Sequence, residues 1–342
     1  MTMSEPKPGL PKAGPSEFDP SELGPSELDL SKLGLTVRLA SPRGFCAGVE
    51  RAIRTVEEAL TVYGAPVYVR HEIVHNRHVV QRLRAMGAVF IEDLKDAPED
   101  RPVIFSAHGA PRSAHKEAAA RNMISIDATC PLVLKVHAQT RRHAASGRHV
   151  YLVGHANHPE VIGTMGQAPT GAVTLVETVE EIATLPNRTG PKAYVTQTTL
   201  SVDDAHAIID ALKQRFPDIA GPAKKDICYA TSNRQHAVKT AAPDVDVFVI
   251  IGSEASSNSK RLVEVALSAG ARDAILIEDA SAFNPALLDT AQTIGISAGA
   301  SAPESLVEEF LTSLAAIRTL TIETVETVRE DIVFNTPLRL AS

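Results

Sequence analysis

Three short segments of this chain place a cysteine between an apolar run and the start of a helical pattern. They contain Cys46, Cys130 and Cys228, and the 342-residue sequence has no other cysteine. Before Cys46, residues 35–39 form an apolar run, and after it apolar residues recur at helical spacing. We expect a strand before each cysteine and a helix after it. A chain that makes this turn three times is predicted to contain three related α/β units.

The turn around Cys46 suits a thiol that binds a metal. Gly44 and Gly48 allow a tight turn and the close approach of a ligand to the backbone. A thiol at a helix start faces the positive end of the helix dipole, which lowers its pKa and favours the thiolate. After Cys130, Pro131 takes the first helical position, where its missing N–H costs nothing. We therefore expect metal-binding thiolates at helix N-termini.

Length and composition limit the class of protein. A chain of 342 residues predicts two or three domains, and 44% hydrophobic with 22% charged residues is typical of a soluble globular protein. No apolar run reaches the length of a membrane span. The net charge of −7 argues against nucleic acid or an anionic membrane as a partner, so an anionic substrate must be met by a local site. Three cysteines without a secretory signal favour a cytoplasmic location.

Two regions differ in their pattern. Residues 1–34 carry an acidic five-residue repeat rich in Pro, Ser and Glu, which predicts a disordered N-terminal tail. From residue 35 onward, apolar strands alternate with helical patterns, which predicts parallel sheets that bind ligands at the carboxyl ends of their strands. Strands are expected at 67–69, 103–106, 150–153, 194–196, 247–251 and 294–297, and helices at 76–86, 202–215 and 259–269.

Each cysteine is followed by two polar loops. The first loop has a His or Asn 29, 28 and 30 residues after the cysteine, and the key residues of the first and second loops are His75 and His108, His158 and Thr198, and Asn258 and Ser301. We predict three similar α/β modules at 35–128, 129–225 and 226–315 around a pseudo-threefold axis, with a shared central cavity. Residues 316–342 are predicted to return as an edge strand or clasp.

Three thiolates that converge on one cavity would leave one coordination position free. This arrangement fits an open zinc site or a [4Fe–4S] cluster with one iron that has no protein ligand. The chain has no CxxC pair, the usual pattern of structural zinc. The alternative is three unrelated buried cysteines, because free cysteine is among the most buried residue types.

The polar loops supply donors for an anion with many acceptor oxygens, such as a diphosphate. These donors are His75, His108, His158, Thr198, Ser256, Ser257, Asn258 and Ser301. Glu160 is the only carboxylate in the set; near a metal and an anion it would have a raised pKa and pass protons, with Thr198 as a relay. Its alternative role is that of a charge at a helix start. The dinucleotide and ATP motifs are absent, so reducing equivalents are expected from another protein.

Nine motifs in order give the chain a family resemblance from about residue 37 to 335. They read PRGFCAGV, HNR, SAHG, DATCP, GHxxHPEVxGTMGQ, TQTTLS, DICYATxNRQ, SSNSxRL and AGASAP. Together they make the chain similar to the 4-hydroxy-3-methylbut-2-enyl diphosphate reductase (IspH/LytB) family. Small departures are Asn157, where the family often has glycine, and Ser232, where threonine is expected.

The resemblance implies a three-lobed α/β fold around a central [4Fe–4S] cluster. It implies that Cys46, Cys130 and Cys228 bind the cluster, and that Thr198 and Glu160 face the substrate hydroxyl, with Glu160 as the proton source. The diphosphate would be held by His75, His108, His158, Ser256, Ser257, Asn258 and Ser301.

The implied reaction is the last step of the non-mevalonate isoprenoid pathway. (E)-4-hydroxy-3-methylbut-2-enyl diphosphate loses its allylic hydroxyl by reduction, giving isopentenyl diphosphate and dimethylallyl diphosphate. The two electrons would come one at a time from ferredoxin or flavodoxin.

Three other functions remain open at this point. An iron–sulfur hydro-lyase would remove a hydroxyl without net reduction, and a requirement for an electron donor separates it from a reductase. An iron–sulfur sensor or scaffold has no use for the diphosphate donors. An open zinc hydrolase is separated by metal content.

Overall fold

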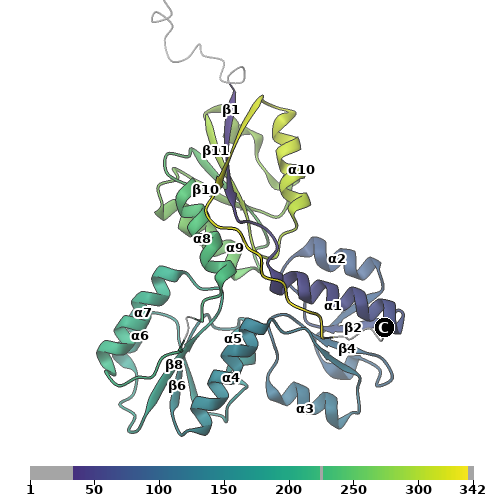
Figure 1. The fold of residues 1–342 in the computed structure, drawn as a ribbon, viewed down its shortest axis with the longest axis vertical. Coiled ribbons are helices and arrows are strands. Elements are labelled where there is room, and N and C mark those ends of the chain that lie inside the picture. Colours follow the sequence, from purple (N-terminus) through teal and green to yellow (C-terminus); the bar gives the residue numbers. More distant parts are fainter. Residues whose placement is uncertain (1–33, 224–225, 338–342) are drawn as a thin grey trace, which may run out of the picture.

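The computed structural model describes residues 34–223 and 226–337. The predicted tail lies outside these residues, apart from Gly34. The described chain forms three parallel sheets that build three lobes around a centre (Figure 1). Among the described residues, no helix is long and apolar enough to cross a membrane.

The four-stranded sheet forms one lobe. Its strands, in spatial order, are β3 (Ala88–Ile91), β2 (Val67–Arg70), β4 (Val103–Phe105) and β5 (Ser125–Asp127). Apolar side chains of α1 (Ala47–Tyr63) and α2 (Arg77–Ala85) cover one face, and those of α3 (Arg112–Ala120) and a 3₁₀ turn at Leu94–Asp96 cover the other. Burial on both faces is why its strands read as short continuous apolar runs.

The three-stranded sheet forms the second lobe in the same way. Its strand order is β7 (Val173–Val176), β6 (His149–Val153) and β8 (Lys192–Thr196). One face packs on α4 (Pro131–Ala145) and α5 (Pro159–Met165), and the other on α6 (Val179–Thr184) and α7 (Val202–Arg215).

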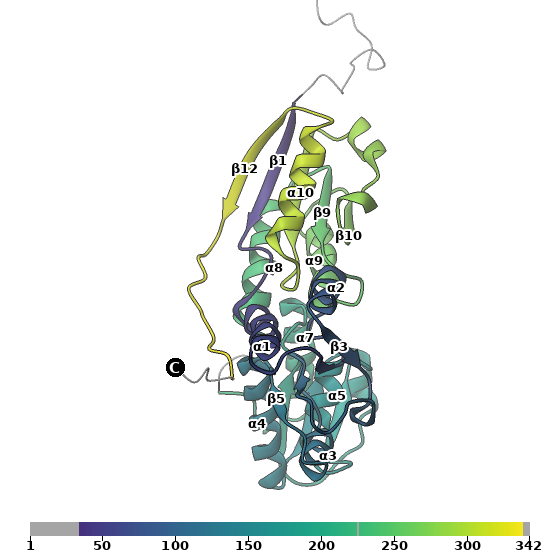
Figure 2. The same ribbon diagram turned by 90° about the vertical axis from the view of Figure 1, so that its right-hand side faces the viewer.

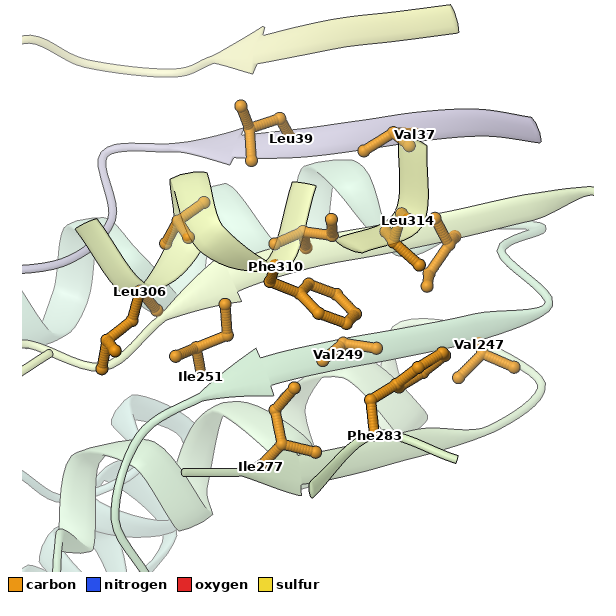
Figure 3. Packing of buried hydrophobic residues seen from close by; sticks show 14 of the residues in the cluster. Val37, Leu39, Val247, Val249, Ile251, Ile277, Phe283, Leu306, Phe310 and Leu314 are labelled. Atoms are coloured by element: carbon orange, nitrogen blue, oxygen red, sulfur yellow. The ribbon is translucent and has the colours of Figure 1, made fainter. Parts of the chain in front are cut away.

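The five-stranded sheet forms the third lobe. Its order is β10 (Ala274–Ile277), β9 (Val247–Ile251), β11 (Thr293–Ala298), β1 (Leu35–Ser41) and β12 (Leu320–Glu326). One face packs on α8 (Tyr229–Ala241) and α9 (Ser257–Ser268), and the other on α10 (Glu304–Ala315), with 3₁₀ turns at Ala280–Ala282 and Pro285–Asp289. In Figure 3, Phe310 of α10 lies between Leu39 of β1 and Val249 of β9, and its ring meets that of Phe283 at 5.0 Å between ring centroids. Apolar residues of α10 recur every three to four positions, which is why this helix buries one face.

The three sheets are consistent with three α/β modules. Strands β2–β5 lie in residues 35–128, β6–β8 in 129–225 and β9–β11 in 226–315, and β12 pairs with β1 at the edge of the third sheet. One expected element is different. β1 lies in the third sheet, between β11 and β12, and not with the rest of residues 35–128.

The strand expected before Cys228 is absent from the described residues. Ala220 makes only an isolated bridge to Ala193, and residues 221–223 and 226–227 form no strand. Polar and proline residues at 221–226 leave no alternating or continuous apolar pattern that would sustain a strand there.

The three cysteines mark the points where the chain passes from one lobe to the next. Cys46 follows β1 of the five-stranded sheet and begins α1, which packs on the four-stranded sheet. Cys130 follows β5 of that sheet and begins α4, which packs on the three-stranded sheet. Cys228 follows the second lobe and begins α8, which packs back on the five-stranded sheet. The chain therefore closes a ring of three lobes, and its cysteines lie at the three junctions.

After β12, residues 327–337 run in an extended course from the five-stranded sheet down along α1 (Figure 2). We call this segment the C-terminal strap. It is attached by Arg54 Nη2, which donates to the carbonyl of Phe334, and by further contacts to two buried arginines.

Candidate active site

One cavity at the junction of the three lobes is lined by all twelve residues that the sequence singles out. These residues are Cys46, His75, His108, Cys130, His158, Glu160, Thr198, Cys228, Ser256, Ser257, Asn258 and Ser301. With the exception of Cys228, each belongs to a loop or helix start that follows the carboxyl end of a parallel strand. Parallel sheets bind ligands at that edge, and here three such edges face one another. Their convergence is observed; their roles remain predictions.

Each cysteine is pinned by its backbone to a polar loop of the same lobe. The N–H of Cys46 donates to the carbonyl of Ala300 at 3.2 Å, beside Ser301. In the second junction, Cys130 N–H donates to Ala107 at 3.0 Å, beside His108. In the third, Cys228 N–H donates to the Thr198 carbonyl at 3.1 Å. Thiols and polar loops are thus fixed relative to one another by the main chain.

The thiols are close enough to interact but do not surround one ion. A Cβ on Gly48 would lie 2.7 Å from Cys130 Sγ and 3.8 Å from Cys46 Sγ, so glycine is required to leave room for both sulfurs. Among the described residues, no three His, Cys, Asp or Glu side chains are grouped closely enough to hold a single metal ion. Three separated thiols on the wall of one cavity are a donor set that fits a group with several metal atoms.

Burial opposes the thiolate form, contrary to the expectation from the helix dipole. Burial, followed by the neighbouring thiol of Cys46, raises the pKa of Cys130 to about 12 and that of Cys228 to about 11. Backbone N–H groups at the helix start lower the pKa of Cys130, but less than burial raises it. Thiolates at these two positions therefore need a cationic partner.

The three histidines form one cluster. The rings of His75 and His108 stack with centroids 4.2 Å apart, and the His158 ring meets both edge-on at 5.9 Å. Burial lowers the pKa of His158 to about 4 and that of His108 well below its ordinary value, with the neighbouring imidazoles adding to both effects. His158 Nδ1 accepts a hydrogen bond from the Glu160 N–H, so its proton lies on Nε2 when the ring is neutral.

Several polar atoms of this cluster have no partner in the described structure. They are His75 Nε2 and both side-chain atoms of the Asn258 amide, all buried. Asn258 lies in the first turn of α9, whose N-cap is Ser256. A helix N-terminus presents free N–H groups, and buried polar atoms without partners carry a free-energy cost. Both features favour a polar, anionic occupant.

Glu160 is a buried carboxyl with two hydrogen bonds from one residue. The Thr198 N–H donates to Oε1 at 2.7 Å and the Thr198 hydroxyl donates to Oε2 at 2.9 Å. Burial raises the pKa of Glu160 to about 7, although both hydrogen bonds lower it. The carboxyl can therefore hold or release a proton near neutral pH.

Two polar residues of the cavity wall were not singled out from the sequence. They are Thr199 and Thr231, and the Thr231 hydroxyl lies 3.1 Å from Cys228 Sγ. Thr231 stands in the DICYATxNRQ motif three residues after the cysteine, the usual N3 position of a cap, which is the signal that was available. Gly48 was noted for the freedom of its backbone, but it is also needed because a side chain there would collide with the sulfur of Cys130.

A second hollow adjoins the cavity and shares three of its residues, His75, His158 and Ser257. We call it the vestibule. Its outer wall carries Lys260 and Arg261, and Arg261 is engaged by Asp204 and Glu264 whereas Lys260 is exposed. Asn157, also in the vestibule, has φ 64°, the left-handed region that glycine adopts most easily and that asparagine tolerates.

Known proteins share this chain's sequence over most of its length. The profile of the family described as LytB protein matches residues 37–315. A 4-hydroxy-3-methylbut-2-enyl diphosphate reductase of Hyphomonas neptunium is 58% identical over 308 residues, which cover 90% of this chain and 98% of that protein. The protein of the same name from Phenylobacterium zucineum is also 58% identical, with the same coverage.

Solved structures share the fold. The E-1-hydroxy-2-methyl-but-2-enyl-4-diphosphate reductase of Plasmodium falciparum superposes with a TM-score of 0.85 at 38% identity, covering 89% of this chain and 96% of that one. A second, described as the terminal enzyme of the non-mevalonate pathway, gives a TM-score of 0.60 at 34% identity, covering 83% and 100%. The predicted fold class and the resemblance are confirmed: the chain belongs to the LytB protein family.

Proposed function

We propose that the central cavity of this reductase binds (E)-4-hydroxy-3-methylbut-2-enyl diphosphate and reduces it to isopentenyl and dimethylallyl diphosphate. The observation that carries the proposal is the convergence of three thiols, three histidines and one buried carboxyl on a single cavity. A hydro-lyase or a sensor has the thiols in common with a reductase. The family's named activity is a reduction, and it consumes two electrons and two protons for each C–O bond that becomes water.

Cys46, Cys130 and Cys228 would hold a [4Fe–4S] cluster. The support is their placement on the wall of one cavity and the glycine that leaves space between two of the sulfurs. When bound, such a cluster supplies single electrons and a Lewis-acidic iron beside the substrate hydroxyl. Its electrons are proposed to come from ferredoxin or flavodoxin, and three free thiols are consistent with a cytoplasmic location.

The diphosphate would lie against the histidine cluster and the start of α9. Their lowered pKa values make His108 and His158 neutral donors, and among the described residues the Asn258 amide and His75 Nε2 have no hydrogen-bond partner. Ser257 and Ser301 complete the wall, with the Ser301 hydroxyl held by its bond to the His75 carbonyl at 3.0 Å. Ser256 caps α9 and so orients its first turn.

Glu160 and Thr198 would move protons. The protonated carboxyl delivers one proton to the departing hydroxyl through Thr198, so that water leaves in place of hydroxide. A second proton goes to either end of the allyl group, which accounts for two products. The bonded pair keeps the carboxyl fixed beside the thiols and shielded from bulk water.

The test begins with protein purified without oxygen. About four iron and four sulfide per chain are expected, with turnover that requires a one-electron donor. Cys46→Ser, Cys130→Ser and Cys228→Ser should each lose iron and activity, whereas Ser232→Thr, which changes no cavity residue, should keep both. Zinc alone, or turnover without an electron donor, would reject the reductase mechanism.

A further inference from the structure

A basic residue follows each cysteine by five or six positions, on the helix that the cysteine begins. These residues are Arg51 on α1, Lys135 on α4 and Arg234 on α8. Each contacts the segment just before another cysteine: Arg51 the one before Cys130, Lys135 the one before Cys228, and Arg234 the one before Cys46. None of them lines the cavity.

Arg51 connects the first cysteine junction to the second. Its Nη1 donates to the carbonyl of Thr129 at 2.9 Å, which is the carbonyl of the peptide bond that leads into Cys130. Arg51 is 7% exposed, and its Nε also donates to the carbonyl of Asn335 in the C-terminal strap at 2.8 Å. All of these hydrogen-bond acceptors are neutral carbonyls. The Arg51 charge interacts electrostatically with the Asp127 carboxylate first and then with Cys130.

Arg234 connects the third junction back to the first. Its Nε and Nη2 donate to the carbonyls of Gly44 and Phe45 at 2.9 and 3.0 Å, and the second of these leads directly into Cys46. The side chain is fully buried, and among the described residues its ionic partner is Glu330 of the C-terminal strap at 3.1 Å. Burying an arginine costs free energy unless its N–H groups are hydrogen-bonded. The contacts of Arg234 therefore form a specific structural arrangement.

Lys135 completes the set between the second junction and the third. Its Nζ lies 3.1 Å from Oδ1 of Asp226, whose carboxyl is fully buried two residues before Cys228. Asp226 Oδ2 in turn accepts from the Thr196 N–H at 3.2 Å, at the end of β8. Here a salt bridge does what guanidinium–carbonyl bonds do at the other two junctions.

We propose that Arg51, Lys135 and Arg234 form a ring of positioning residues, the basic ring, which fixes the three cysteines relative to one another and stabilises the negative charge of an iron–sulfur cluster bound by them. This inference rests on the proposed function, because it assigns the ring to the cluster. Each member ties the helix of one cysteine to the segment before the next, so the three contacts close the triangle of thiols. Positive charge held near thiolate ligands raises the reduction potential and slows the loss of iron, and Arg51 interacts electrostatically with Cys130 in this way.

The test uses holoenzyme prepared without oxygen. Iron release to the chelator bathophenanthroline is measured by absorbance, and the midpoint potential by a redox titration followed by electron paramagnetic resonance. Arg51→Gln and Lys135→Gln should release iron about 10- to 100-fold faster than wild type and have a lower midpoint potential. Arg51→Lys keeps the charge and loses the paired N–H geometry, so it should restore the potential more fully than the iron retention.

The matched control is Arg54→Gln. Arg54 is exposed on the same helix and contacts the strap at Phe334, so the variant makes the same charge change without touching a cysteine segment. Iron release and potential in Arg51→Gln and Lys135→Gln equal to those of Arg54→Gln would overturn the ring. If Arg51→Gln does not fold, Lys135→Gln decides, because its side chain is 32% exposed and tolerates polar replacement. If wild-type protein purified without oxygen contained no iron–sulfur cluster, the proposed function would be rejected, and the basic ring with it.

Discussion

The environment of the cavity reverses the usual order of acidity between a carboxyl and an imidazole. Glu160 and His158 are two residues apart and hydrogen-bonded through the main chain, yet burial raises the pKa of Glu160 to about 7 and lowers that of His158 to about 4. Near neutral pH the proton reservoir of the free enzyme is therefore the carboxyl, and the His158 imidazole is a neutral donor. Motifs identify these residues, but the acidity depends on burial, which a sequence does not show.

Replacement of Glu160 by glutamine tests the proton source. Activity of the wild type should fall as pH rises above about 7, because the carboxyl then loses the proton it delivers. Glu160→Gln should lower kcat by about 100-fold or more and remove this limb of the pH profile. Iron content and diphosphate binding, measured by calorimetry with inorganic diphosphate, should remain. A wild-type rate in the variant would exclude Glu160 as the donor.

The same carboxyl predicts a pH dependence of stability. Its pKa is raised in the folded protein, so its contribution to the free energy of unfolding is complete below the ordinary carboxyl pKa and is lost as pH rises through about 7. Glu160→Gln cannot ionise, and its melting temperature should decline less between pH 6 and pH 8 than that of wild type. Equal declines in the two proteins would show that the folded protein does not lose a proton from Glu160 in this range.

Gly48 is predicted to be essential for cluster binding and not for the fold. A Cβ there would lie 2.7 Å from Cys130 Sγ, and the sulfur has to move. Gly48→Ala should retain less than about a tenth of the wild-type iron while its circular dichroism stays folded. The control is Gly34→Ala, whose Cβ would meet nothing closer than 3.7 Å. Full iron content in Gly48→Ala would show that the cysteine sulfurs can move enough to accommodate a Cβ at this position.

At the scale of elements, the sequence predicts where helices and strands lie better than it predicts which strands pair. The expected strand 247–251 and helix 202–215 match β9 and α7 to the residue, because continuous burial and helical spacing are local patterns. The pairing of β1 with β11 joins residues more than 250 positions apart, and no local pattern encodes it. The prediction of a strand before Cys228 was wrong, because it followed the analogy with the other two cysteines although the segment before Cys228 is polar.

The helix starts make the three thiols unequal. Cys228 Sγ accepts from the Thr231 N–H and lies 3.1 Å from its hydroxyl, whereas Cys46 and Cys130 have no side-chain cap bond. Hydrogen bonds to cluster sulfurs raise the reduction potential. Thr231→Val should lower the midpoint potential by roughly 40 mV, the equivalent of about 1 kcal/mol for one electron. Thr231→Ser keeps the hydroxyl and should restore the potential; an unchanged potential in Thr231→Val would contradict the assignment.

At the scale of the whole molecule, the ring of lobes explains why distant motifs meet. The chain passes through each junction once, and every passage delivers a cysteine together with the polar loops of an adjoining sheet edge. Repetition of the cysteine and loop pattern predicts this convergence without predicting which lobe each helix joins. The strap adds what the pattern could not indicate, because Glu330 and Asn335 reach the two buried arginines from the far end of the chain.

Because the overall charge is negative, an anionic substrate must be attracted by positive charge close to the cavity. The chain carries a net charge of −7, yet the cavity must admit a diphosphate, and Lys260 is exposed at the vestibule beside His158. Electrostatic steering by this lysine should raise the association rate. Lys260→Gln should therefore lower kcat/KM by about tenfold at low salt, with kcat within about twofold of wild type, and the difference should vanish near 1 M salt, where the Debye length is about 3 Å. Lys116→Gln, an equal charge change on the exposed face of α3, should leave kcat/KM unchanged.

If both variants lose kcat/KM equally, the net charge of the molecule governs association and the vestibule lysine has no special part. If neither variant loses kcat/KM, the substrate reaches the cavity by another side.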